Sequence, residues 1–325
     1  PMKSPTFPRP LAACLLVACA SAAHANCGTA FCLVNTHWET LGAPVDPGWQ
    51  IDLRYESIEQ DRFWLGEREA TAAEVLALGP GGQPNRTRNR NLVLNVDYVF
   101  DERTSVSLRT SYVDFELARK ITPSVEVRAD YRAWGDTEAL LRRVVHEGAD
   151  SSTGLAVGVK LPTGGTDRDG GIYVDGDYAA DYGPLERGIQ PGTGTTDGVL
   201  GLYHSRRLAR DWSAYAQAFV RAARGQADGY HPGRRLSADA GASWFGPAGW
   251  SLSAQLAYND RHRDDGALAE PKSANTTVAA SLGVAWALLP ELRAYLFYQH
   301  PLTRRTEGVQ TVADGSWVGG VSLRF

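Results

Sequence analysis

The chain has 325 residues, of which 43% are hydrophobic and 22% charged, and its formal net charge at pH 7 is -4. That length fits one large domain or two ordinary ones, so length alone decides little. A mildly acidic balance does not supply the basic surface that nucleic-acid binding needs, and we expect no nucleic-acid partner.

The first residues have the pattern of an export signal. Lys3 and Arg9 precede a short apolar run from Leu11 to Ala20, and the small-x-small triplet 23–25 follows as a cleavage site. The run is about half of the roughly 20 apolar residues that a spanning helix needs. We expect a signal peptide over residues 1–25. The alternative is a lipoprotein box ending at Cys19, which would then be acylated; the first residue of the mature chain distinguishes the two.

From Gly48 onward, apolar and polar residues alternate in segments of about ten residues. In the first segment, Trp49, Leu53 and Tyr55 share one face, while Asp52 and Arg54 share the other. Equivalent segments lie at 92–100, 106–112, 155–161, 212–221, 236–244, 252–258, 278–286, 292–299 and 317–325. Two strands with ambiguous faces complete the set, at 137–145, where Arg142 and Arg143 could point either way, and at 197–208, where the same holds for His204 and Arg206. The pattern predicts about twelve strands.

The connections between these segments are alternately short and long. Short ones lie at 101–103, 147–151, 209–211, 246–248 and 289–291, and long ones at 58–89, 115–135, 162–196, 225–233, 259–275 and 301–314. Bacterial outer-membrane barrels have short periplasmic turns and longer extracellular loops. The sequence therefore predicts an all-β fold, a transmembrane antiparallel β-barrel over residues 48–325 with both ends at the periplasmic side.

A soluble β-sandwich also alternates apolar and polar residues, with its apolar face in a core. Two features favour the barrel. Charges lie in mid-strand on the polar face, as a wet interior permits, and aromatic residues stand at strand ends, as membrane interfaces require. These aromatic residues are Trp49, Phe100, Trp212, Trp244, Trp286, Trp317 and Phe325. In lipid the sheet must also close, because an open edge leaves backbone groups unpaired.

Three motifs resemble a known family. They are GVKLPTGG at 158–165, QPGTGTTD at 190–197 and, more weakly, RNRNL at 88–92. In order and spacing they are similar to the outer-membrane transporter family of the meta-pathway of phenol degradation. The resemblance spans about residues 48–325 and implies a membrane-spanning barrel that passes small solutes, hydrophobic or aromatic ones included. The family has no settled substrate, and no binding or catalytic residue is carried over.

Cys27 and Cys32 are the cysteines that remain after cleavage, and the oxidising periplasm favours a local disulfide between them. The other interpretations are a redox pair or a metal clip with His37. We expect residues 26–47 to form a periplasmic segment under or inside the barrel mouth. The acidic loop 166–181 is either a solvated loop or a calcium site, although its spacing is not that of an EF-hand.

Charged residues on the clear inward faces are the candidate lumen-lining residues. They are Asp52, Arg54, Glu56, Asp97, Arg109, Lys160, Arg221, Asp239, Arg293 and Arg324. They either brace the wall as ion pairs or select solutes in a pore. Their mixed signs predict weak ion selectivity. About twelve strands predict a narrow pore, constricted by the loop 162–196 or by the N-terminal segment.

No nucleophile and base can be paired by spacing. His204 and Ser205 are adjacent and so point to opposite faces of a strand. We therefore predict no enzyme, no cofactor and no metal, but a passive channel for small solutes. The alternative is a non-conducting structural or adhesion barrel acting through its loops. Expected partners are outer-membrane lipid, lipopolysaccharide and the barrel-assembly machinery, the last through the strand that ends in Phe325.

Overall fold

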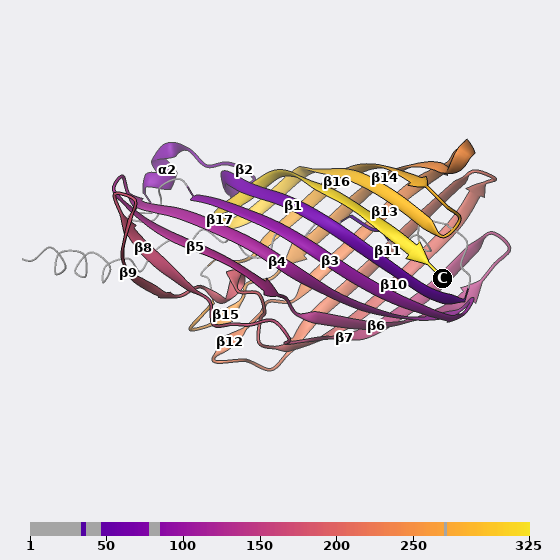
Figure 1. Cartoon of the computed structure of the whole chain (residues 1–325), viewed down its shortest axis with the longest axis horizontal. Coiled ribbons are helices and arrows are strands. Elements are labelled where there is room, and N and C mark those ends of the chain that lie inside the picture. The colour runs from indigo at the N-terminus through magenta and orange to yellow at the C-terminus, as the bar shows by residue number, and fades with distance from the viewer. Residues whose placement is uncertain (1–33, 37–46, 78–84, 270–271) are drawn as a thin grey trace, which may run out of the picture.

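The structure is a computed structural model, which describes residues 34–36, 47–77, 85–269 and 272–325 (Figure 1). The predicted signal peptide and Cys19, Cys27 and Cys32 lie outside these residues. Helical structure in the described ranges consists of α2 (Ala72–Leu76) and two 3-10 turns, η1 (Arg187–Ile189) and η2 (Pro247–Gly249). None of the helices in these ranges has the length and apolar character to cross a membrane.

Eleven labelled strands pair antiparallel into a closed ring. Their order around it is β1 (Gly48–Gly66), β3 (Asn85–Asp101), β4 (Thr104–Thr122), β6 (Thr137–Glu147), β7 (Ser151–Leu161), β10 (Thr196–Ala209), β11 (Trp212–Arg224), β13 (Arg235–Phe245), β14 (Trp250–Arg261), β16 (Asn275–Ala287) and β17 (Leu292–Arg324). The ring closes because β1 pairs with β3 on one side and with β17 on the other. A closed ring has no edge strand, as a sheet in lipid requires.

Strand β17 contains two arms. Residues Arg293 to Thr306 pair with β16, and Thr306 to Arg324 pair with β1. The chain reverses at Gly308, whose φ is 75°, and the rings of Tyr298 and Trp317 on the two arms are 4.8 Å apart. With both arms of this hairpin counted, the described ring has twelve strand segments. This agrees with the number predicted from the sequence.

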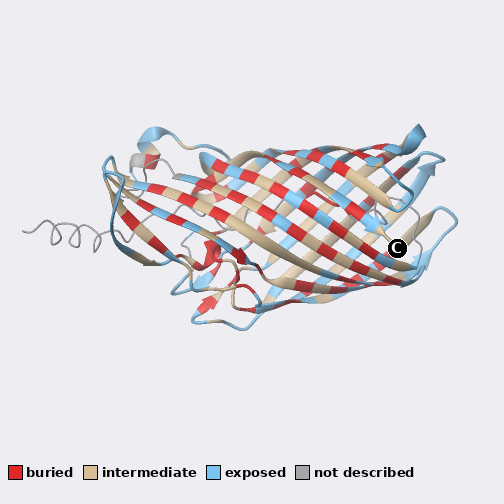
Figure 2. Cartoon of the chain, in the orientation of Figure 1, coloured by how far each residue is buried: buried red, intermediate tan, exposed pale blue. Residues whose placement is uncertain are grey.

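Burial along the strands is opposite to that of a soluble protein. Figure 2 shows buried and exposed residues alternating along the wall. In β14, Ser253 is 7% exposed whereas its neighbour Leu252 is 52% exposed, and large apolar side chains are exposed all around the ring. A wall that turns leucines outward and serines inward fits lipid outside and water inside. The barrel is confirmed over the sandwich.

Aromatic side chains gather on the outer wall toward the end with the short turns. Trp49, Phe100, Trp212 and Phe325 are exposed there, and Trp250 stacks on Trp286 at 5.0 Å. Trp244 is half-buried opposite Trp212, and Trp317 lies further along the wall, next to Tyr298. Tryptophan and tyrosine prefer the membrane interface, because one end of the ring system is apolar and the other is polar.

The wall continues beyond the predicted strands at the other end of the barrel (Figure 1). Strand β4 extends to Thr122 and pairs with β5 (Val125–Trp134); β5 pairs with β8 (Asp169–Val174), and β8 with β9 (Asp177–Pro184). Strands β1 and β3 are also longer than predicted, and β1 pairs with a short β2 (Arg68–Glu69). The sequence pattern missed these extensions because strands that leave the membrane no longer have one face in lipid.

Candidate functional site

The described part of the N-terminal segment, Val34 to Thr36, lies inside the barrel. The backbone N–H of Asn35 donates to Gln255 Oε1 at 3.0 Å, and Gln255 Nε2 donates back to the Asn35 carbonyl at 2.9 Å. Arg54 Nη1 donates to Thr36 Oγ1 at 3.1 Å. These contacts bind the segment to two walls of the ring.

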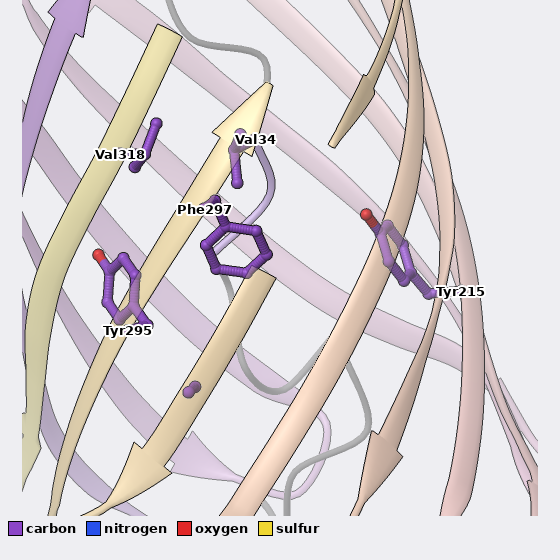
Figure 3. Close-up of a cluster of buried hydrophobic side chains, with 6 residues drawn as sticks. Val34, Tyr215, Tyr295, Phe297 and Val318 are labelled. Carbon is purple, nitrogen blue, oxygen red and sulfur yellow. The ribbon is translucent and has the colours of Figure 1, made fainter. Parts of the chain in front are cut away.

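An apolar cluster holds the same segment. Figure 3 shows Val34 beside Phe297, with Tyr215, Tyr295 and Val318 nearby, and all five side chains are buried. Tyr215, Tyr295, Phe297 and Val318 stand on inward positions of β11 and β17, where polar residues would be expected in an empty, water-filled lumen. Segment and wall together partly fill the barrel.

The loop after β7 supplies a second obstruction. Its first half forms the hairpin β8–β9, and its second half turns into the barrel, where η1 lies with Leu185 and Ile189 buried. Ile189 packs against Phe115 and other apolar residues of β4 and β5, and Tyr131 donates its hydroxyl to the Ile189 carbonyl at 2.5 Å. Residues 185–195 therefore lie inside the ring, and they belong to the loop 162–196 that the sequence predicts to constrict the pore.

Two further loops meet this one at the same end. Arg187 of η1 forms an ion pair with Asp228 at 2.8 Å, and its backbone N–H donates to the Leu268 carbonyl at 3.5 Å. The loops that contain Asp228 and Leu268 are joined by β12 (Tyr230–His231) and β15 (Asp265–Gly266). Buried Tyr230 donates to Asp264 at 2.9 Å. The three loops support one another over the extracellular mouth.

Asp136 binds the constriction loop to the wall. Its carboxylate accepts from Lys160 Nζ at 2.9 Å, from the Gly164 N–H at 3.1 Å and from the Thr193 N–H at 3.0 Å. Lys160 also pairs with Asp197 at 3.3 Å and contacts Thr193 Oγ1. We call Asp136, Lys160, Thr193 and Asp197 the loop latch. It joins the β5–β6 connection to both ends of the loop.

The latch accounts for two of the three sequence motifs. Gly164 of LPTGG and Gly192 of QPGTG lie against each other, and a Cβ on Gly192 would stand 2.3 Å from the Gly164 carbonyl oxygen. A side chain at either position would therefore force the backbones apart. The motifs meet in space and hold the two ends of the loop together, although the sequence separates them.

A cavity of 320 Å³ lies within the ring and is bounded by Val34 to Thr36 and by residues 187–193. Eight basic and four acidic side chains line it. The basic ones are Arg54, Arg109, Arg142, Lys160, Arg187, Arg221, Arg235 and Arg261, and the acidic ones are Asp136, Glu138, Asp197 and Asp239. The cavity is therefore rich in positive charge, although the whole chain carries a net charge of -4.

The structure divides the ten predicted lumen-lining residues into two groups. Arg54, Arg109, Lys160, Arg221 and Asp239 line the cavity, whereas Asp52, Glu56, Asp97, Arg293 and Arg324 do not. In the second group, Asp52 and Glu56 are buried: Asp52 accepts from Tyr295 at 2.9 Å, and Glu56 pairs with Arg54 at 2.8 Å. Arg293 and Arg324 lie near the short-turn end. Most of the predicted residues that line the cavity are therefore basic, whereas most of the predicted acidic residues lie outside it.

Some ion pairs in the lumen join adjacent strands and others do not. Lys160 of β7 pairs with Asp197 on the adjacent β10, but Arg221 of β11 reaches Glu138 of β6, which β10 and β7 separate from it in the ring. Asp239 accepts from Gln217 at 2.9 Å on the adjacent strand. The Arg221–Glu138 pair crosses part of the lumen and narrows it. An ion pair between adjacent strands stays along the wall and does not.

Several cavity residues were missed from the sequence. Arg142 faces inward, while Arg143, His204 and Arg206 face outward, which settles the ambiguous strands. Arg235 and Arg261 continue the inward parity of Asp239 and Gln255 along their strands. That parity was a usable signal. No such signal was available for Arg187, because it lies on a loop and not on a strand.

The cavity lining also contains apolar side chains. Val113, Phe115 and Tyr131 come from β4 and β5, and Leu140, Val199 and Phe219 come from β6, β10 and β11. The Phe115 and Tyr131 rings stack at 5.0 Å. The cavity therefore offers both guanidinium groups and aromatic faces to a solute.

His204 is exposed on the outer wall, where it contacts Thr153 at 2.9 Å, and Ser205 faces inward toward Ser152. The two side chains lie on opposite faces, as predicted, and cannot act as a catalytic pair. Within the described ranges, which include the acidic loop 166–181, no three His, Cys, Asp or Glu side chains are grouped as metal ligands.

Among solved structures, the fold is similar to the COG4313 outer membrane channel from Pseudomonas putida F1, with a TM-score of 0.65 and 11% identity over 90% of this chain and 100% of that one. The chain has the fold of an outer-membrane β-barrel. The NanC porin gives a TM-score of 0.48 at 8% identity, over 85% of this chain and 100% of that one. The CymD monoaromatic hydrocarbon channel gives 0.45 at 12% identity, over 86% and 89%. No protein-family profile and no curated protein matches the sequence.

Proposed function

We propose that this barrel is a non-enzymatic outer-membrane channel that lets small solutes cross by passive diffusion. The observation that carries the proposal is the 320 Å³ cavity inside the ring, lined by both charged and aromatic side chains. Small-molecule sites in proteins begin at about this size, and they combine apolar walls with a few placed polar groups. The wall around it faces lipid, so a solute in the cavity is already inside the membrane.

The apolar residues of the cavity lining support hydrophobic or aromatic solutes, as the sequence resemblance implies. Val113, Phe115 and Ile189 form a continuous apolar surface from the mouth loop to the wall. Assembly through the strand ending in Phe325 and contact of the loops with lipopolysaccharide remain predictions.

A non-conducting barrel is the second candidate, because two segments enter the lumen. Val34 to Thr36 and residues 187–193 lie at the two sides of the cavity, and both are held by several hydrogen bonds. Such a barrel would act through its long loops on surfaces or partner proteins.

Reconstitution of the purified barrel in a planar bilayer separates the two candidates. In concentrated KCl we expect stepwise, small single-channel currents, because a twelve-strand lumen with two inserted segments leaves a narrow path. Bilayers that receive folded barrel, verified by its heat-modifiable migration on a gel, and still show no current steps would contradict the channel and favour the non-conducting barrel.

A further inference from the structure

Arg142 is a cavity-lining arginine without an anionic partner. It is 6% exposed and stands on the inward face of β6. Within the described ranges no carboxylate lies within 4.0 Å of its guanidinium, and its Nε has no hydrogen-bond partner. A buried cation without an anionic partner raises the free energy of the folded protein. A carboxylate beside it would form strong charge-assisted hydrogen bonds.

The acids that the structure describes around Arg142 form no ion pair with it, although the Oδ2 of Asp239 has no hydrogen-bond partner. The charge of Arg142 attracts the carboxylates of Asp97 on β3 and Asp239 on β13. Asp97 accepts from Asn95, and Asp239 accepts from Gln217 at 2.9 Å. Glu138, two positions from Leu140 on the same face of β6, pairs with Arg221. Acidic side chains therefore lie near Arg142, but none of those described forms an ion pair with its guanidinium.

Arg109 shows the same condition on the neighbouring strand. It lines the cavity opposite Glu138 in the β4–β6 register, and it makes no hydrogen bond or ion pair in the described part of the chain. Arg54 and Arg221 add positive charge around it, and Glu56 and Glu138 add negative charge without forming an ion pair with it. Two unpaired guanidinium groups thus face one enclosed space.

Aromatic rings surround the Arg142 guanidinium. Its Cζ is 5.7 Å from the centroid of Tyr203 and 5.8 Å from that of Phe219. Both rings lie flat over glycines of the adjacent strands: a Cβ on Gly154 would stand 2.1 Å from the Tyr203 ring, and one on Gly201 would stand 2.2 Å from the Phe219 ring. Because glycine has no side chain, these two positions leave room for the rings against the wall.

We propose that Arg142, with Arg109 and the ring of Phe219, binds small organic acids whose carboxylate is joined to an apolar body of about one arene. The fork of a guanidinium matches a carboxylate in two parallel hydrogen bonds. Phe219, Leu140 and Val199 supply the apolar surface for the body. This inference rests on the proposed channel and names its solute class as anionic. It replaces the weak selectivity predicted from mixed signs.

Calorimetric titration of the folded barrel in detergent tests this site. The probes are benzoate, benzyl alcohol, which has the ring without the charge, and acetate, which has the charge without the ring. We expect benzoate to bind more tightly than either. Arg142→Gln should weaken benzoate binding by about tenfold or more, since a charge-assisted pair is lost, and leave benzyl alcohol unchanged.

Arg143→Gln is the matched control, because Arg143 follows Arg142 on β6 and faces outward. It should leave all three titrations unchanged. If Arg142→Gln does not fold, Phe219→Leu serves instead, and it should weaken benzoate but not acetate. Benzoate binding no tighter than that of acetate or benzyl alcohol, or equal in wild type and Arg142→Gln, overturns the site. Absence of bilayer current alongside intact benzoate binding overturns the channel and not the site.

Discussion

Replacing Asp136 with alanine is expected to release the constriction loop and enlarge the single-channel current. Asp136 holds Lys160, Gly164 and Thr193 at once, and it is nearly buried. Lys160 keeps Asp197, but the loop loses the hydrogen bonds of the Gly164 and Thr193 N–H groups to a carboxylate, which contribute about 1.5–3 kcal/mol each. This loss raises the population of the released loop by roughly two orders of magnitude or more. Planar-bilayer recordings should show larger or more frequent open levels.

Asp114→Ala is the control for this experiment. Asp114 pairs with Arg132 at 3.2 Å, and the Arg132 side chain is 70% exposed. An exposed pair contributes about 0–1 kcal/mol, so the current should stay at the wild-type level. If Asp136→Ala folds and conducts as the wild type does, residues 185–195 do not limit the passage.

Replacing Leu282 with arginine is expected to destabilise the barrel in lipid strongly. Leu282 is 70% exposed at the middle of β16, on the outer face of the ring. In water such a position accepts arginine at little cost, but at the bilayer midplane the charge costs about 2–4 kcal/mol. Denaturant unfolding of the barrel in lipid vesicles measures this loss.

Leu268→Arg makes the same chemical change outside the membrane. Leu268 is 41% exposed on the loop between β15 and β16. A surface substitution of this kind changes the free energy of unfolding by about 0.5 kcal/mol or less. Equal losses for the two variants would mean that the outer wall at Leu282 does not face lipid.

Strand parity is the part of the fold that the sequence predicts well. A two-residue period with one face in lipid and one in water leaves little freedom of register, because a slip by one residue would turn every leucine inward. The prediction fails where this contrast is lost. In β6, the doublets Leu140-Leu141 and Arg142-Arg143 put like residues on both faces, and the inward Arg142 was therefore missed.

The interior is harder to predict than the wall. The loop latch joins Asp136, Gly164 and Thr193, which lie far apart in sequence, and no local pattern indicates that they meet. The two motif glycines were visible as motifs, but their mutual contact was not. Likewise, the excess of basic residues in the cavity appears only when the inward residues of many strands are brought together: Arg142, Arg235 and Arg261 line the cavity, whereas Asp52, Glu56 and Asp97 do not.

Alternation of lipid and water contact along one strand tests the central claim most directly. Spin labels on single cysteines at residues 251–256 of β14, with every native cysteine of the chain replaced by serine, can be measured in vesicles against oxygen and a water-soluble nickel chelate. We predict that labels at Leu252, Ala254 and Leu256 collide mainly with oxygen, and that labels at Ser251, Ser253 and Gln255 do not. Equal accessibility at all six positions, or oxygen contact on the serine face, would contradict a wall with lipid outside and a polar lumen within.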